Sequence, residues 1–316
     1  MIRYLTRRAL FSVPTLVGVS IAVFLLLRVI PGDPVTSQAG ETLALSRQEI
    51  AALRADLGLD RPLYEQYLIW AGDFLRGDGG RSLSNRNPTL ANLAVALPVT
   101  LQLALSTLVV ALAVAIPFGV IAAVKQNSWF DYLIRGGVVL GLSIPDFWIG
   151  TMILVYFALF FSWTVPFGYT SIFVDPVRNI QQFGLPVLVI GIRLSASTLR
   201  FTRAGMLEVL GEDYIRTARA KGLKASTVVM RHALRNALIP IVTVVGLQVA
   251  NLLGGTVVME TLFSLPGIGL LTISSVRLLD YTQVQTNVMV FAIFTVSINF
   301  IVDAAYAIID PRIRLS

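Results

Sequence analysis

Four long stretches of this chain contain no charged residue, and they constrain its fold more than any other feature. They cover residues 9–27, 87–124, 236–259 and 281–302. Each stretch is long enough to cross the roughly 30 Å hydrocarbon layer of a membrane as a helix. The pattern therefore predicts at least that many membrane-spanning helices.

Two further apolar stretches, residues 132–162 and 183–199, each carry a charge near the middle, Asp146 and Arg193, and the first also has Arg135 close to its start. With them the chain has six predicted spans, an even number that places both termini on the same side of the membrane. Of the 316 residues 55% are apolar and 14% charged, and the mean hydropathy is +0.76, which excludes an ordinary soluble domain. We predict an all-α membrane protein with six transmembrane helices.

Basic residues indicate which side each loop faces, because cytoplasmic loops are enriched in Lys and Arg. Arg3, Arg7 and Arg8 precede the first span, and Arg312 and Arg314 end the chain. The gap between the fourth and fifth spans carries more of them: Arg200, Arg203, Arg216, Arg219, Lys221, Lys224, Arg231 and Arg235. Both termini and the 200–235 loop are therefore predicted to be cytoplasmic. The net charge of +7 reflects this topology and not a nucleic-acid surface.

A polar insert, residues 31–96, separates the first two spans and is predicted to lie outside the cell. Ser46 and Glu49 form a capping box that predicts one helix. Pro62 predicts the start of a second helix, whose apolar stripe consists of Leu63, Tyr67, Trp70 and Phe74. The insert either packs onto the ends of the spans or offers a platform to an external partner.

The cytoplasmic loop contains a short amphipathic segment, Asp213 to Gly222. Asp213 suits the first helical turn, and Gly222 allows the chain to reverse after the helix. Tyr214, Ile215 and Ala218 fall on one side, whereas Arg216, Arg219 and Lys221 fall on others. An apolar side outside the bilayer can dock into a groove, and the small Ala218 and Ala220 permit a close approach. Ser226 is predicted to cap a second helix that leads toward Pro240. The plainer interpretation is a basic loop that only orients the protein.

Arg216-Thr217-Ala218, followed by Gly222, resembles the EAA loop of ABC importer permeases in the variant form of the dipeptide/oligopeptide/nickel permease family. The usual Glu-Ala-Ala start is replaced here, and the usual Leu-Pro falls at Leu234-Arg235. Similar segments extend over nearly the whole chain: Arg28-Val-Ile-Pro-Gly-Asp-Pro34, Gly58-Leu-Asp-Arg-Pro62, Gly77-Asp78 with Ser82-Leu83, Pro98-Val-Thr-Leu101, Ser143-Ile-Pro145, Glu260-Thr-Leu-Phe-Ser-Leu-Pro-Gly-Ile-Gly269 and Asp310-Pro-Arg-Ile-Arg314.

The resemblance implies a type I ABC importer permease fold. Residues 1–30 would form an N-terminal interfacial segment and the first span, 31–96 the external helical insert, 97–309 the core with its coupling loop at 204–236, and 310–316 a cytoplasmic tail. The assembly would contain a homologous second permease, two cytoplasmic ATPase subunits that use ATP and Mg²⁺, and an extracytoplasmic solute-binding protein. Its place would be the cytoplasmic (inner) membrane of a bacterium.

By the same resemblance, the short amphipathic helix would couple this chain to the ATPase. The residues implied are Tyr214, Arg216, Thr217, Ala218, Ala220, Lys221 and Gly222. The sequence contains no Gly-x-x-x-x-Gly-Lys-[Ser/Thr] phosphate loop, so another chain must hydrolyse ATP. The absence of cysteine excludes disulfides and thiolate metal sites. We predict a transport subunit that is not an enzyme, with no catalytic residue, no metal site and no bound cofactor of its own.

Three charged residues within or beside the spans are candidates for the translocation path. Asp146 and Arg193 each lie near the middle of a predicted span, where an unpaired charge costs at least about 2.5 kcal/mol. They either pair with each other or line the path and meet the two ends of a zwitterionic peptide. Glu260 ends the fifth predicted span and is either part of an outer gate or an interfacial carboxylate.

Two alternatives to a peptide importer remain open at this point. The same type of importer could carry nickel chelates, glutathione or another small solute. A secondary transporter driven by ions would instead use Asp146 and Asp303 as coupling carboxylates, and it would need no ATPase.

Overall fold

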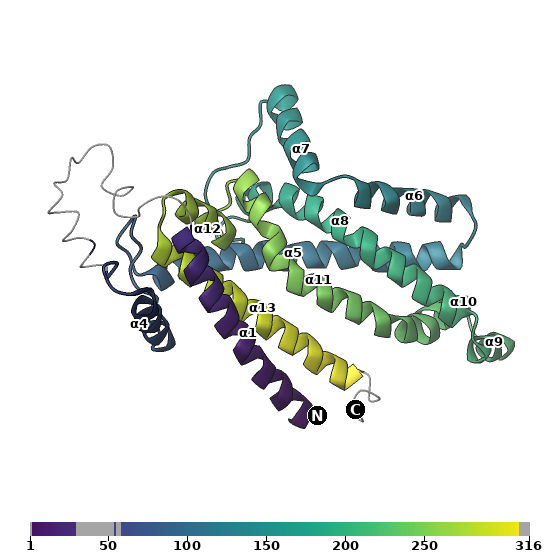
Figure 1. Ribbon diagram of the computed structural model, residues 1–316. Helices are drawn as coiled ribbons and strands as arrows, with labels where there is room; N and C mark the ends of the chain where they lie inside the picture. The colour runs from purple at the N-terminus through teal and green to yellow at the C-terminus, as the bar shows by residue number, and fades with distance from the viewer. Residues whose placement is uncertain (1, 30–53, 55–57, 310–316) are drawn as a thin grey trace. The chain divides into compact units, whose positions relative to one another are not determined.

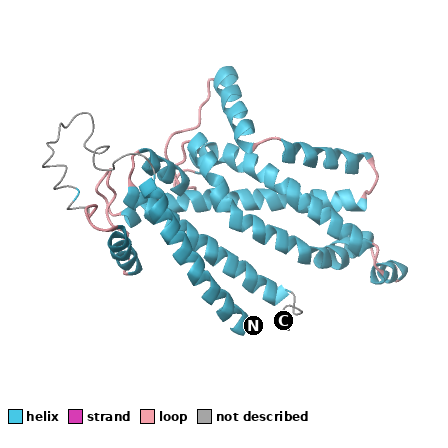
Figure 2. Ribbon diagram, viewed as in Figure 1, coloured by secondary structure: helices cyan, strands magenta, loops and turns pink. Residues whose placement is uncertain are grey.

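The computed structural model describes residues 2–29, 54 and 58–309, and in this part the regular elements are helices joined by loops, without a strand (Figure 2). The predicted capping box at Ser46 and Glu49 lies outside the described residues. Figure 1 labels most of the helices, which are α1 (Ile2–Val29), α4 (Leu63–Leu75), α5 (Thr89–Val124), α6 (Trp129–Ser143), α7 (Asp146–Phe161), α8 (Pro176–Leu210), α9 (Asp213–Ala220), α10 (Ala225–Thr227), the π-helix η1 (Val228–Ala233), α11 (Leu234–Leu262), α12 (Ile268–Arg277) and α13 (Tyr281–Ile309).

The predicted number of spans agrees with the helices, provided that bent helix pairs count as single spans. Four helical stretches in the described part are long and apolar enough to cross a membrane: Leu10–Val29, Thr89–Val124, Pro176–Leu210 and Tyr281–Val302. Two bent pairs raise the number to six if each pair is one span. One pair is α6 with α7, and the other lies within residues 225–249.

The prediction of one continuous span over residues 132–162 is wrong in its geometry. α6 and α7 meet at a bend of 94°, and Asp146 is the first residue of α7 and does not lie inside a continuous helix. The break has a local cause, since Pro145 has no N–H to donate and disfavours helical geometry at the residue before it. Ile144 accordingly adopts extended backbone angles, with φ −99° and ψ 127°.

Two other helices extend further than their apolar stretches indicate. α8 continues well beyond residues 183–199 at both ends. Its early start has a local cause, because the Asp175 side chain accepts a hydrogen bond from the Arg178 N–H at 3.0 Å and Pro176 occupies the first turn. α1 runs without a break from Ile2 to Val29, so no turn separates the predicted interfacial segment from the first span.

The described residues form two compact units. One unit contains residues 101–265 and the end of α13 from residue 298, and the other contains the described residues of 2–100 and 266–297. α5 and α13 each contribute to both units.

In the second unit the insert helix α4 packs on α1 through its predicted aromatic stripe. The rings of Tyr67 and Phe24 are 5.4 Å apart at 75°, and the Tyr67 and Ser20 hydroxyls are 2.8 Å apart. Arg28 donates to the Gln66 side chain at 2.9 Å. The predicted helix after Pro62 is confirmed, and its stripe contacts the first span.

A buried carboxylate that the sequence did not indicate joins two distant segments of the same unit. Asp280 is fully buried before α13 and accepts hydrogen bonds from the backbone N–H of Leu83 at 3.0 Å, Ser84 at 3.2 Å and Gln283 at 3.1 Å. The Ser82 hydroxyl also donates to it. These bonds satisfy the backbone at the start of α13 and hold the segment before α5 against it.

In the first unit α8 packs along α11, α6 and α7, as Figure 1 shows for α8 and α11. α5 also approaches α8 closely, because a Cβ atom on Gly119 would lie 2.6 Å from Thr202 and one on Gly191 would lie 2.9 Å from Val110. Small residues allow such close packing of apolar helices.

An ion pair fixes α6 to α8 in this unit. Arg203 donates from Nε to Asp131 Oδ1 at 2.7 Å and from Nη2 to Oδ2 at 2.8 Å. Asp131 is fully buried and also accepts from the Asn127 N–H at 3.0 Å. No pattern in the sequence indicated this pair.

Candidate functional site

The predicted amphipathic helix of the basic loop is present as α9. It begins at Asp213, which places an acidic side chain in the first turn, and it ends at Ala220. The next residues turn through hydrogen bonds from the Lys221 N–H to the Thr217 carbonyl at 3.0 Å and from the Gly222 N–H to the Arg219 carbonyl at 2.9 Å. Gly222 has φ +76°, the left-handed region in which glycine is favoured. The predicted helix and its glycine stop are confirmed.

The apolar side of α9 faces its own chain. Ile215 is fully buried and Ala218 is 8% exposed, and both belong to one buried cluster. The other members come from α5, α8, η1 and α11: Val120, Ala123, Met206, Val228, Ala233, Leu234 and Ala237. α9 is therefore anchored to the ends of several helices of the first unit.

This anchoring corrects the prediction that the apolar side of α9, with Ala218, is free to dock into another protein. The ends of α5, α8, η1 and α11 leave an apolar surface, and Ile215 and Ala218, which lie three residues apart on one face, cover it. The small size of Ala218 permits a close approach, but to its own chain.

The outward side of α9 is polar and cationic. Arg216, Thr217, Ala220 and Lys221 are exposed, and Tyr214 is 41% exposed. Arg216 pairs with Asp213 one turn earlier, and the Thr217 hydroxyl donates to the Asp213 carbonyl at 3.0 Å. These residues form the surface that a partner can reach.

Contacts to neighbouring elements fix the orientation of this surface. Asn236 in α11 donates to the Tyr214 hydroxyl at 2.8 Å and to the His232 carbonyl at 3.0 Å. Tyr214 therefore links the outward side of α9 to the first turn of α11.

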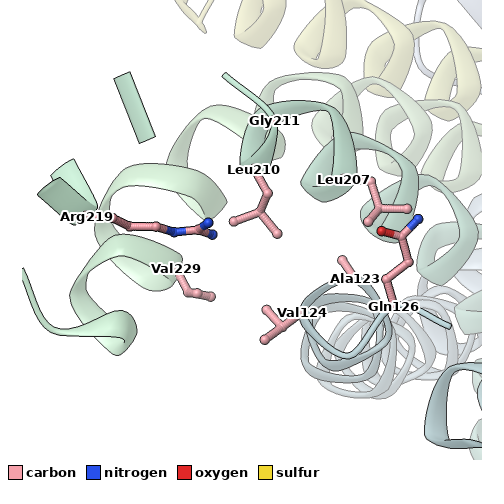
Figure 3. A pocket seen from close by; sticks show the side chains of 8 residues that line it. All are labelled: Ala123, Val124, Gln126, Leu207, Leu210, Gly211, Arg219 and Val229. Carbon is pink, nitrogen blue, oxygen red and sulfur yellow. The ribbon is translucent and has the colours of Figure 1, made fainter. Parts of the chain in front are cut away.

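A cavity of about 360 Å³ lies beside α9, between it and the ends of α5 and α8. Figure 3 shows the Arg219 side chain reaching from α9 toward Leu210. The remaining lining is apolar or uncharged: Ala123, Val124, Gln126, Leu207, Gly211 and Val229. The buried cluster thus holds one side of α9, while open space remains along another.

The connection from α9 to α11 differs from the prediction. Ser226 does not cap a helix, because α10 begins at Ala225 after Lys224 and has no side-chain cap. α10 leads directly into the π-helix η1 and then into α11. π-helical turns are rare in proteins and often occur at functional sites. A displacement of α9 would be transmitted to α11 through α10 and η1.

The predicted contact between Asp146 and Arg193 is present. Arg193 Nη1 lies 3.2 Å from Asp146 Oδ2, and the side chains are 52% and 23% exposed, respectively. The pair borders a cavity of about 260 Å³ formed by α6, α7, α8 and α11. The role of the ion pair in a translocation path stays a prediction.

Glu260 is fully buried in α11. This burial does not fit an interfacial carboxylate that faces water, while a part in an outer gate stays a prediction. The sequence also missed the hydrogen bond between the Thr198 hydroxyl and Gln248 Oε1, 2.9 Å long, which joins α8 to α11.

Gly222 provides a test of the turn after α9. A Cβ atom there would meet no atom within 4 Å, so a substitution acts through the backbone alone. We expect Gly222→Val to strain the turn by roughly 1–3 kcal/mol, and Gly222→Asn, which tolerates this backbone region, to strain it much less. Hydrogen exchange of the 213–223 amides should therefore be faster in the Val variant only. Equal exchange in the two variants would show that the positive φ does not hold the turn.

Comparisons with known proteins show which family this chain belongs to. Residues 115–315 match the model of the family described as binding-protein-dependent transport system inner membrane component. Residues 1–104 match the N-terminal model of binding-protein-dependent transport system membrane components.

Several relatives are similar over nearly their full length. The dipeptide transport system permease protein DppB of Escherichia coli (strain K12) is 39% identical, with 99% of both chains covered. The di/tripeptide transport system permease protein DppB of Pseudomonas aeruginosa (strain UCBPP-PA14) and the glutathione transport system permease protein GsiC of Escherichia coli (strain K12) are each 40% identical, also with 99% of both chains covered.

Among solved structures, a chain of the MetNI methionine ABC transporter in an inward-facing conformation has the same fold. The TM-score is 0.57 at 17% sequence identity, and the match covers 70% of this chain and 97% of that one.

Proposed function

Because the chain belongs to the family of binding-protein-dependent transport system inner membrane components, we propose that it is the transmembrane permease subunit of an ABC importer for di- and oligopeptides. The observation that carries this proposal is the 39–40% identity, over 99% of the chain, to permeases of dipeptide and di/tripeptide transport systems. The fold shared with the methionine transporter chain agrees with a type I importer permease.

The importer needs partners, since this sequence has no phosphate loop with which to bind ATP. A second permease of the same family completes the path, two ATPase subunits bind and hydrolyse ATP with Mg²⁺, and an extracytoplasmic binding protein delivers the solute. This chain itself performs no catalysis. Its basic loop and both termini face the cytoplasm, in agreement with the positive-inside rule.

The outward side of α9 contacts the ATPase in this proposal. The contact residues are Tyr214, Arg216, Thr217, Ala220 and Lys221, which are exposed in the free chain. Ala218 acts from the other side, where it anchors the helix, and Gly222 shapes the turn that follows.

The buried cluster around Ile215 supplies the mechanical link. Closure of the ATPase dimer moves α9, and the cluster passes this movement to α5, α8, η1 and α11 together. A close-packed interior deforms little, so the helix ends move with α9 instead of sliding past it. ATP binding favours one arrangement of the spans only through this differential contact.

Peptides are the favoured cargo, although identity alone does not separate dipeptides from glutathione. The dipeptide and the glutathione permeases are similar to this chain at 39% and 40% identity. Glutathione is itself a tripeptide derivative with charged ends, so both relatives point to zwitterionic peptide-like solutes.

Reconstituted vesicles test the proposal. We expect the complete complex, with its binding protein, to concentrate a dipeptide when ATP is present and an ionophore has removed all ion gradients. A matched complex whose ATPase subunits bind but do not hydrolyse ATP should not. Uptake driven by an ion gradient without the ATPase subunits would instead identify a secondary transporter, and would overturn the proposal.

A further inference from the structure

The ion pair between Asp146 and Arg193 differs from the buried ion pair of the same unit, Asp131 with Arg203. Asp131 and Arg203 meet through two hydrogen bonds, and Asp131 is fully buried. Asp146 and Arg193 share a single contact of 3.2 Å, and both side chains keep exposed surface. The first pair is a closed structural link, while the second retains unused hydrogen-bonding capacity.

That unused capacity faces a cavity. The 260 Å³ space has both charges in its wall, together with Leu142, Ile190, Leu194, Ser197, Gln248 and Leu252. Gln248 is fixed in this wall, because its side chain accepts from the Thr198 hydroxyl at 2.9 Å and donates to the Leu194 carbonyl at 3.4 Å. The space suits a small solute, since sites for drug-sized ligands begin at about 300 Å³.

The break between α6 and α7 places the carboxylate at this cavity. Asp146 directly follows Pro145 and opens α7, and besides pairing with Arg193 its side chain accepts a hydrogen bond from the adjacent Phe147 N–H at 3.2 Å. Arg193 comes from the continuous helix α8. The two charges thus belong to elements that can separate without unfolding either helix.

We infer that Asp146 and Arg193 form a subsite for the two charged ends of a zwitterionic peptide, an inference that rests on the proposed importer function. The peptide ammonium group replaces Arg193 at Asp146, and the peptide carboxylate replaces Asp146 at Arg193. Each charge keeps an opposite partner throughout this exchange. A solute with one charged end leaves one of the two side chains unpaired, which is costly in an apolar setting. The subsite therefore selects against singly charged and neutral solutes.

The absence of cysteine in the native chain allows a direct test. The variant Ser197→Cys places a thiol in the cavity wall. The sample is the assembled complex in lipid vesicles without the binding protein. Alkylation of the thiol is measured as an increase in the mass of this subunit. We expect Ala-Ala at a concentration above its Kd to slow alkylation about threefold or more. Ala-Ala that is acetylated and amidated at its ends should not slow it. Ser226→Cys, at an exposed position outside the cavity, is the matched control and should be alkylated at the same rate with either peptide.

Charge variants then test which end of the peptide each residue contacts. In the Ser197→Cys background, Asp146→Asn should make N-acetyl-Ala-Ala protect the thiol from alkylation better than Ala-Ala does, because only Arg193 remains and it binds a carboxylate. Arg193→Gln should make the C-terminal amide of Ala-Ala the better protecting peptide, because only Asp146 remains and it binds an ammonium group. If the pair were purely structural, neither variant would be protected better by one blocked peptide than by the other. That result would overturn the inference.

The comparison in the Ser197→Cys single variant is decisive even if the charge variants fail to assemble. Equal protection by zwitterionic and blocked Ala-Ala, or no protection by either, would overturn the subsite. ATP-driven uptake by the same vesicles with the binding protein added is measured separately. Normal uptake without protection rejects the subsite alone, whereas uptake that does not depend on ATP rejects the importer.

Discussion

Replacing Ala218 by Glu is expected to reduce ATP-driven peptide uptake roughly 100-fold, because burial of an unpaired carboxylate costs several kcal/mol. Ala218 is 8% exposed and packs in the cluster that anchors α9 to α5, α8, η1 and α11. A glutamate there would displace α9 from the buried cluster, so ATP hydrolysis would no longer move the spans. Uptake and substrate-stimulated ATP turnover of the reconstituted complex measure the effect.

The matched control is Ala225→Glu, which makes the same substitution at an exposed position in the same loop. We expect this variant to retain uptake and stimulated ATP turnover within about twofold, since surface substitutions change stability by about 0.5 kcal/mol or less. The amount of Ala218→Glu protein in the membrane should stay close to that of the parent. Normal coupling in Ala218→Glu would contradict the role of the buried cluster as the link from α9 to the spans.

Breaking the pair between Asp131 and Arg203 should give the largest loss of stability. Asp131→Leu leaves the Arg203 guanidinium without its carboxylate, and removing one partner of a buried pair costs about 3–5 kcal/mol. We expect the midpoint of thermal unfolding in detergent to fall by roughly 10 °C. Asp131→Leu together with Arg203→Leu should lose less than either single variant, because no buried charge is left unpaired.

An exposed pair provides the comparison for this prediction. Asp213 and Arg216 also form an ion pair, but their side chains are largely exposed. Asp213→Leu should therefore shift the unfolding midpoint hardly at all, as exposed pairs contribute about 0–1 kcal/mol. Additive losses in the Asp131 and Arg203 variants would show that the two side chains stabilise the unit independently.

Much of the helical architecture could be predicted from the sequence. The uncharged stretches at 87–124 and 281–302 coincide closely with α5 and with the apolar part of α13. The start of α4 after Pro62 and the end of α9 before Gly222 were also visible. These features are local, because apolar runs, proline and glycine act on the backbone within a turn or two of their own positions.

The candidate site was predictable only in part. The sequence indicated a short amphipathic helix with basic residues, and α9 has that form. It did not indicate which side of the helix is buried, since an apolar side can pack on its own chain or on a partner. That choice depends on Val120, Met206 and Leu234, which belong to three other helices, α5, α8 and α11.

The sequence by itself determined that this chain is a helical membrane protein and where its uncharged spans lie, because membrane solvation acts on each stretch separately. Only the tertiary structure decided how Asp146 meets Arg193, how Asp131 meets Arg203 and how Asp280 holds the segment at Ser82. Each of these contacts joins residues that are distant along the chain. A charged side chain has several possible partners of opposite charge, and the packing of the helices selects one of them.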